Sequence, residues 1–243
     1  MGIPPSVQPL WDVLQQEVVR IHAYWINYRQ LFGKSKERID LLNDCAGQFF
    51  FIISDSLLTD VQLSLSRLAD PAETFKKENA ALERLLKEIA ALNIPQFPDE
   101  LATLLQNYRD RCKDIKVRRD KELAHADLGA LLQRYGSAAG RTTILGPSRQ
   151  EIERALAALR EFMNAINIHF IGCPMNYEEF ILDNACDGES LVGILKQGLR
   201  YDELRKAQEL PFEDLKKLSC YDASLLSKLA PQLPARCGAC AGT

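Results

Sequence analysis

The chain has 243 residues, 47% of them hydrophobic and 26% charged, which is typical of one large globular domain or one domain with an appendage. Its net charge of −3 excludes a general nucleic-acid-coating protein, because such proteins are strongly basic. No run approaches the roughly 18 uncharged apolar residues of a membrane span, and the N-terminus lacks signal-peptide features, so we expect a cytoplasmic protein that does not enter a membrane.

Helical periodicity dominates the first half of the chain, and no segment has the alternating pattern of a convincing strand. Apolar residues at intervals of three and four predict a first helix over 10–32 and a second over 36–65. Asp70 is the predicted N-cap of a third helix over about 71–92, with Pro71 at its first position.

The second half begins with a predicted fourth helix over about 98–128, followed by a Gly- and Thr-containing loop to residue 147. Ser148 and Glu151 have the spacing of a capping box. They predict the start of a fifth helix, which ends before Gly172. Short helices joined by turns are expected from there to residue 230.

This order of long helices predicts an all-α fold, an up-and-down helical bundle of four to five helices with a C-terminal helical extension. We expect the bundle over residues 8–172, the extension over 173–230 and a flexible tail over 231–243. Cys237 and Cys240 in the tail form one Cys-x-x-Cys pair. Because a structural zinc site needs four ligands and no second pair has this spacing, we expect no metal and no cofactor.

The most informative segment is 119–125 (RDKELAH), in which a histidine follows an arginine by six positions. Cleaving RNA without a metal needs a group that moves protons near neutral pH, and histidine has an unperturbed pKa of about 6.5. It also needs a permanent cation at the scissile phosphate, and the arginine guanidinium matches phosphate geometry. Arg119 and His125 are therefore candidate catalytic residues.

The spacing resembles the Rx4–6H signature of the HEPN superfamily (higher eukaryotes and prokaryotes nucleotide-binding domains). More narrowly, the chain resembles the abortive-infection protein U branch of that superfamily. Three separated stretches carry the narrower resemblance and extend it over about residues 8–208: 63–71 (LSLSRLADP), 119–127 (RDKELAHAD) and 195–204 (LKQGLRYDEL). The resemblance implies a HEPN fold and an RNA-cleaving cleft shared between two subunits.

Under this resemblance, His125 exchanges protons with the ribose 2′-hydroxyl or the 5′-oxygen leaving group, and Arg119 stabilises charge on the phosphate oxygens. Asp120 orients either His125 or Arg119. The expected product is a 2′,3′-cyclic phosphate. Four further residues are expected to bind the RNA backbone: Arg118, Lys121, Lys116 and Arg67.

The charge around the motif agrees with an RNA-facing surface, although a solvated basic face is the alternative. Residues 109–121 include seven basic and three acidic residues, a net charge of +4. The motif also has a structural alternative, in which Asp120 and Glu122 pair with neighbouring basic residues and His125 stabilises a helix end.

Three other residues carry weaker predictions. Arg67 forms either a helix-ending salt bridge with Asp70 or reaches the cleft. His22 and His169 lie near apolar stripes, where a structural histidine is the more common case than a ligand.

Helix geometry constrains how Arg119 and His125 could act together. Arg119 follows Ile115 by four positions on the apolar stripe, and because burying an unpaired guanidinium is costly, it needs an acidic partner, a cleft or water. His125 lies about 120° around an ideal helix from Arg119. Either the helix bends or ends near the motif, or two copies face each other. We expect the second arrangement, a homodimer that buries the stretch around Cys112, Ile115 and Arg119.

The leading hypothesis is a metal-independent HEPN-type endoribonuclease, acting in phage defence (abortive infection) or as the toxin of a toxin–antitoxin pair. Its expected partners are RNA, a second copy of the chain and, for a toxin, an antitoxin protein. Two alternatives stay open. One is a non-catalytic HEPN-type RNA- or nucleotide-binding or scaffold module, and the other is a helical partner of a nucleotidyltransferase.

Overall fold

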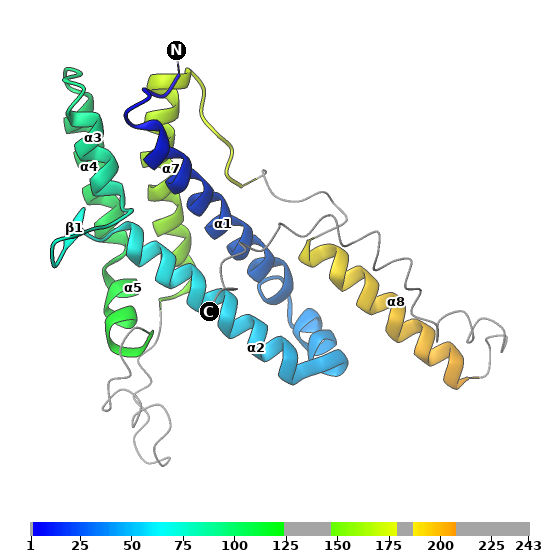
Figure 1. The fold of residues 1–243 in the computed structure, drawn as a ribbon. Coiled ribbons are helices and arrows are strands. Elements are labelled where there is room, and N and C mark those ends of the chain that lie inside the picture. The colour runs from blue at the N-terminus through cyan, green and yellow to red at the C-terminus, as the bar shows by residue number, and fades with distance from the viewer. Residues whose placement is uncertain (1, 124–146, 179–186, 208–243) are drawn as a thin grey trace, which may run out of the picture. The chain divides into compact units, whose positions relative to one another are not determined.

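The computed structural model describes residues 2–123, 147–178 and 187–207, and nearly all of their regular structure is helical (Figure 1). The predicted all-α fold is confirmed. The elements follow in this order: α1 (Gln8–Phe32), α2 (Lys36–Leu68), β1 (Glu73–Thr74), β2 (Lys77–Glu78), α3 (Leu82–Ala90), α4 (Phe97–Arg111), α5 (Lys113–Arg118), η1 (Arg119–Leu123), α7 (Arg149–Ile171) and α8 (Gly188–Lys206). The chain divides into two units, Met1–Gly193 and Ile194–Thr243, with the boundary inside α8. The domain boundaries expected at residues 172 and 230 remain predictions.

The core of the first unit lies between the long helices. α1 packs along α2 in antiparallel orientation, α4 packs along α7, and α3 packs on α4 (Figure 1). The apolar stripe predicted for α1 is largely buried, with Trp11 in addition and Leu10 only partly covered. Its buried members are Leu14, Val18, Ile21, Trp25, Tyr28 and Phe32. Each fully buried side chain of this kind contributes roughly 1.5–3 kcal/mol, so this face fixes α1 in the core.

α2 is kinked and only partly buried. Ser35 accepts a hydrogen bond from the backbone N–H of Arg38 and caps the helix, and Ala46 has non-helical backbone angles (φ −165°, ψ 63°). An 18-residue stretch of α2 has a mean hydropathy of 1.2 and is 33% buried, so by length and composition alone the helix could cross a membrane. This differs from the expectation that no segment is apolar enough, although core helices also meet this criterion.

The segment after α2 is not the predicted third helix. Residues 73–78 form an antiparallel hairpin, whose central residues Phe75 and Lys76 have φ values of 51° and 62°. Such angles form a tight two-residue hairpin turn that usually contains Asn-Gly, which is why the sequence did not reveal it. Asn79 closes the hairpin by donating to the Pro71 carbonyl oxygen at 2.8 Å, and α3 begins only after this turn.

The boundaries of α7 agree with the sequence. The Ser148 hydroxyl accepts from the backbone N–H of Glu151 while the Glu151 carboxylate accepts from that of Ser148, so the capping box is confirmed. Gly172 ends α7 in the left-handed conformation (φ 89°), which glycine adopts without strain. Where short helices joined by turns were expected, residues 188–206 form one continuous helix, α8.

Candidate functional site

The helix that carries the motif changes geometry at the motif itself. α4 ends at Arg111, Cys112 adopts φ −89° and ψ −1°, and α5 follows as a separate short helix. At Arg119 the chain widens into the π-helical turn η1, which contains residues 119–123. Such turns are rare and occur frequently at functional sites. The helix therefore changes geometry near the motif within a single chain, as one of the two predicted arrangements requires. His125 lies outside the described residues.

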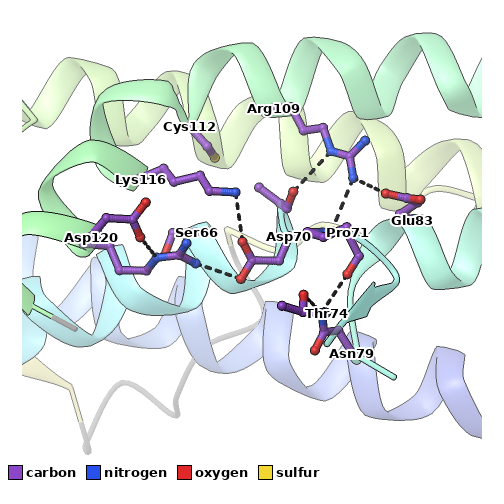
Figure 2. A network of polar contacts seen from close by, with 12 residues as sticks. Ser66, Asp70, Pro71, Thr74, Asn79, Glu83, Arg109, Cys112, Lys116 and Asp120 are labelled. Atoms are coloured by element: carbon purple, nitrogen blue, oxygen red, sulfur yellow. Dashed lines mark hydrogen bonds and ion pairs between the residues drawn. The ribbon is translucent and has the colours of Figure 1, made fainter. Parts of the chain in front are cut away.

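Asp70 joins the end of α2 to this motif (Figure 2). Its Oδ2 atom accepts a hydrogen bond from Arg119 Nη1 at 2.7 Å, and its Oδ1 atom accepts from Lys116 Nζ at 3.0 Å. The Arg119 side chain is 14% exposed and the Asp70 side chain 21% exposed. The carboxylate therefore bridges two cations that lie three residues apart, in a position largely shielded from water.

Arg109 of α4 holds the backbone around Asp70 in position. Its Nε donates to the Ala69 carbonyl oxygen at 3.2 Å and its Nη2 to the Asp70 carbonyl oxygen at 3.4 Å, so it satisfies carbonyl groups at the C-terminus of α2. The same guanidinium pairs with Glu83 of α3 and holds the pKa of that carboxyl below its usual value. Figure 2 shows this second ion pair beside the Asp70 contacts.

Arg119 is held from two sides and stays protonated. Besides Asp70, it donates from Nε to Asp120 Oδ1 at 2.8 Å. Burial alone would lower the pKa of the guanidinium, but hydrogen bonds to Asp70 and Asp120 outweigh it and raise the pKa above its ordinary value. A guanidinium has five N–H groups. The described residues accept two of them, which leaves three for another oxygen-rich ligand.

The residues expected to bind RNA take different positions. Lys116 pairs with Asp70 as described, and Lys121 is exposed. Arg118, the residue directly before Arg119, contacts α2 instead. Its Nη1 donates a hydrogen bond to Gln62 Oε1 at 3.0 Å. Gln62 is fully buried, and its Nε2 has no hydrogen-bond partner within the described part of the chain.

Arg67 does not form the salt bridge with Asp70 that was one of its two predicted roles. Its Nη2 donates to Ser64 Oγ at 2.9 Å and lies 3.8 Å from Glu17 Oε1. Arg67 instead lines a groove of about 930 Å³ between α1, α2 and the segment after β2, and Asp70 lies on the wall of the same groove. The groove contains side chains of both charges, so it is not a simple phosphate site.

The stretch expected at a dimer interface is buried within the chain's own core. Cys112 is 1% exposed and Ile115 is fully buried. Tyr108, one turn earlier, donates its hydroxyl to the Leu65 carbonyl oxygen at 2.6 Å and ties α4 to α2. Burial raises the pKa of the Cys112 thiol to about 12. A dimer interface built on Cys112 and Ile115 is therefore wrong, whereas the dimer itself stays a prediction.

The two other histidines described by the structure lie away from this site. His22 is 1% exposed, and its Nδ1 lies 2.8 Å from the Val18 carbonyl oxygen. Burial lowers the pKa of His22 to about 4, and the nearby Arg160 guanidinium acts in the same direction. His169 is exposed and stacks on Phe97 with ring centroids 3.9 Å apart. Both positions agree with structural roles.

Sequence reasoning missed two residues of the site. Asp70 had been assigned to capping a helix, but its carboxylate binds Arg119 and Lys116, 49 and 46 positions later. The one signal available was that Asp70 stands within the first of the three family-like stretches, while Arg119 opens the second. No feature of the sequence indicated Gln62, which accepts a hydrogen bond from Arg118. In the described ranges no group of three His, Cys, Asp or Glu side chains could hold a metal ion.

Comparison with known proteins adds one finding. The model of a protein family described as AbiU2, a HEPN family, matches residues 6–191 of the chain. The matched region contains both Asp70 and the motif at 119–125. No curated protein and no solved structure matches the chain.

Proposed function

The chain belongs to the AbiU2 family of HEPN domains, and on that premise we propose that it is a metal-independent endoribonuclease. Its biological role in this proposal is phage defence by abortive infection, or the toxin of a toxin–antitoxin pair with a protein antitoxin. The observation that carries the proposal is the state of Arg119. It is charged, held by two carboxylates, and keeps N–H groups that no described residue accepts.

The proposed reaction is an attack of the ribose 2′-hydroxyl on the adjacent phosphorus. The 2′-oxygen forms a bond to phosphorus, the bond to the 5′-oxygen breaks, and a 2′,3′-cyclic phosphate and a 5′-hydroxyl result. His125 removes the 2′-hydroxyl proton or supplies a proton to the leaving oxygen. Arg119 stabilises the charge on the phosphate oxygens in the transition state. Water exchanges the proton that His125 does not carry, so atoms and charges balance without a metal.

Asp120 acts on Arg119 in this proposal. From the sequence it was equally suited to orient His125 or Arg119, and its hydrogen bond to Arg119 Nε at 2.8 Å supports the second role. Lys121 and Arg118 contact the RNA backbone without reading its sequence, as phosphate contacts do in general. A second copy of the chain completes the cleft. Its contact surface does not include Cys112 and Ile115, because the chain's own core already covers them.

The alternative is a non-catalytic HEPN-type RNA- or nucleotide-binding or scaffold module. One observation favours it. Asp70 and Asp120 already neutralise two cations, Lys116 and Arg119, and an ion cluster of this kind can hold α5 against α2 with no ligand at all.

RNA cleavage by the purified full chain, in the presence of a chelator, separates the two functions. Arg119→Ala and His125→Ala should each lower the cleavage rate by at least about 10²-fold, the usual scale for losing a charge-stabilising or acid–base group. Arg111→Ala is the matched control, because Arg111 is an exposed arginine that ends α4 outside the motif. Full activity of His125→Ala, or loss of wild-type activity with the chelator, contradicts the mechanism. Binding of RNA without any cleavage favours the binding module.

A further inference from the structure

We propose that Asp70 is the positioning residue of this site, and that it holds Lys116 and Arg119 together as one two-cation unit that binds the scissile phosphate. The proposal rests on the proposed function, since it assigns Arg119 to a phosphate. It adds Asp70, which follows α2 and lies outside the 119–125 motif. It also assigns different roles to Asp70 and Lys116.

The first support is that Asp70 cannot easily move. Its backbone N–H donates to the Arg67 carbonyl oxygen at 3.1 Å, and its own carbonyl oxygen receives Arg109 Nη2 at 3.4 Å. Pro71 follows directly and restricts the backbone of the residue before it. Arg109 is in turn held by Glu83. The carboxylate of Asp70 therefore starts from a backbone that three elements, α2, α3 and α4, keep in place.

The second support is the arrangement of the two cations. Lys116 and Arg119 are three residues apart, so they lie on one face of α5 and η1, where like charges repel each other. Asp70 places one carboxylate oxygen on each, at 3.0 Å from Lys116 Nζ and 2.7 Å from Arg119 Nη1. Without Asp70, the described residues would leave Arg119 only Asp120, whose side chain is 52% exposed. Asp120 alone would hold the guanidinium loosely.

The third support is that the motif helix, formed by α5 and η1, is bound at two separate points, one on α2 and one just after it. Arg118 reaches Gln62 of α2, and Arg119 reaches Asp70, eight residues further along the chain and two residues beyond the end of α2. Two neighbouring arginines are thus directed to two different points, one within α2 and one just after its end. This fixes the rotation of the motif helix as well as its distance from α2, and so fixes where the remaining N–H groups of Arg119 point.

The division of roles gives a kinetic signature. Asp70 carries a negative charge next to the phosphate position, so it weakens ground-state binding of RNA while it orients the group that acts in the transition state. Asp70→Asn should therefore lower kcat by at least about 10-fold, since small misplacements of catalytic groups have effects of this size, and leave KM unchanged or lower. Lys116→Gln removes a phosphate contact and should instead raise KM.

The experiment combines RNA-cleavage kinetics with NMR of the arginine side chains on the full chain. The ¹⁵N–¹H signal of Arg119 Nε, assigned by its absence in Arg119→Lys, should be sharp in the wild type and broadened or shifted in Asp70→Asn. Asp60→Asn is the matched control, because Asp60 also lies on α2 and pairs with an arginine, Arg20, at 2.5 Å. It should change neither kcat nor the Arg119 signal.

Each outcome decides the proposal. A kcat of Asp70→Asn within about twofold of wild type, or an unchanged Arg119 signal, overturns it. If Asp70→Asn does not fold, Asp70→Glu keeps the charge but displaces the carboxylate, and it should show the same loss of kcat. If the wild type cleaves no RNA, the proposed function fails, and the NMR comparison alone decides whether Asp70 positions Arg119.

Discussion

His22 should make the stability of the fold depend on pH below neutrality. Its imidazole is 1% exposed, and burial lowers its pKa to about 4 in the folded chain, against about 6.5 in an unfolded one. Between these values the unfolded state binds a proton that the folded state does not. Stability is therefore fully present above about pH 6.5 and is lost as the pH falls towards 4. The loss is about 2 kcal/mol at pH 5 and about 3 kcal/mol below pH 4.

The assay is urea unfolding at several pH values between 7.5 and 4.5 for wild type and His22→Gln. Carboxyl groups titrate in the lower part of this range in both proteins, so the quantity of interest is the difference between the two curves. His22→Gln should lose stability less steeply than wild type as the pH falls. His169→Gln, which changes an exposed histidine, should follow the wild-type curve. Parallel curves for wild type and His22→Gln would refute the reasoning.

Two further predictions concern the motif helix and Cys112, which directly precedes it. Replacing Arg118 and Lys121 together by Ala should reduce the slope of log affinity for RNA against log salt by about 1 to 2, since each phosphate contact contributes somewhat less than one; an unchanged slope would place the RNA surface elsewhere. Cys112, buried with a pKa of about 12, should react with iodoacetamide at pH 8 at least about 100-fold more slowly than the exposed Cys173. Peptide mapping of the native protein measures this ratio, and comparable labelling of both thiols would contradict the burial.

Local patterns in the sequence predicted the local structure well. The stripe of α1 and the capping box of Ser148 and Glu151 depend on residues three or four apart, and both are present in the structure. The break between α4 and α5 at Cys112 could not be predicted in this way, because neither Pro nor Gly marks it. The hairpin around Phe75 was also hidden, because its turn lacks the usual residues.

The candidate site was predictable only in part, for a related reason. The position of Arg119 on an apolar stripe correctly indicated that it needs a partner, since a buried guanidinium cannot stay unpaired. The identity of that partner, Asp70, depends on how α2 packs against α5. No periodicity within either segment contains that information. The second catalytic candidate, His125, lies outside the described residues, so its geometry remains a prediction from the motif and the family.

The chemical ends of the RNA fragments test the central claim most directly. Purified full-length protein is incubated with a mixed RNA substrate in excess chelator, and the fragments are analysed by mass spectrometry. The proposed roles of Arg119 and His125 predict upstream fragments ending in a 2′,3′-cyclic phosphate and downstream fragments beginning with a 5′-hydroxyl, both absent with His125→Ala. Fragments with a 5′-phosphate and a 3′-hydroxyl, or the same fragments from His125→Ala, would contradict it.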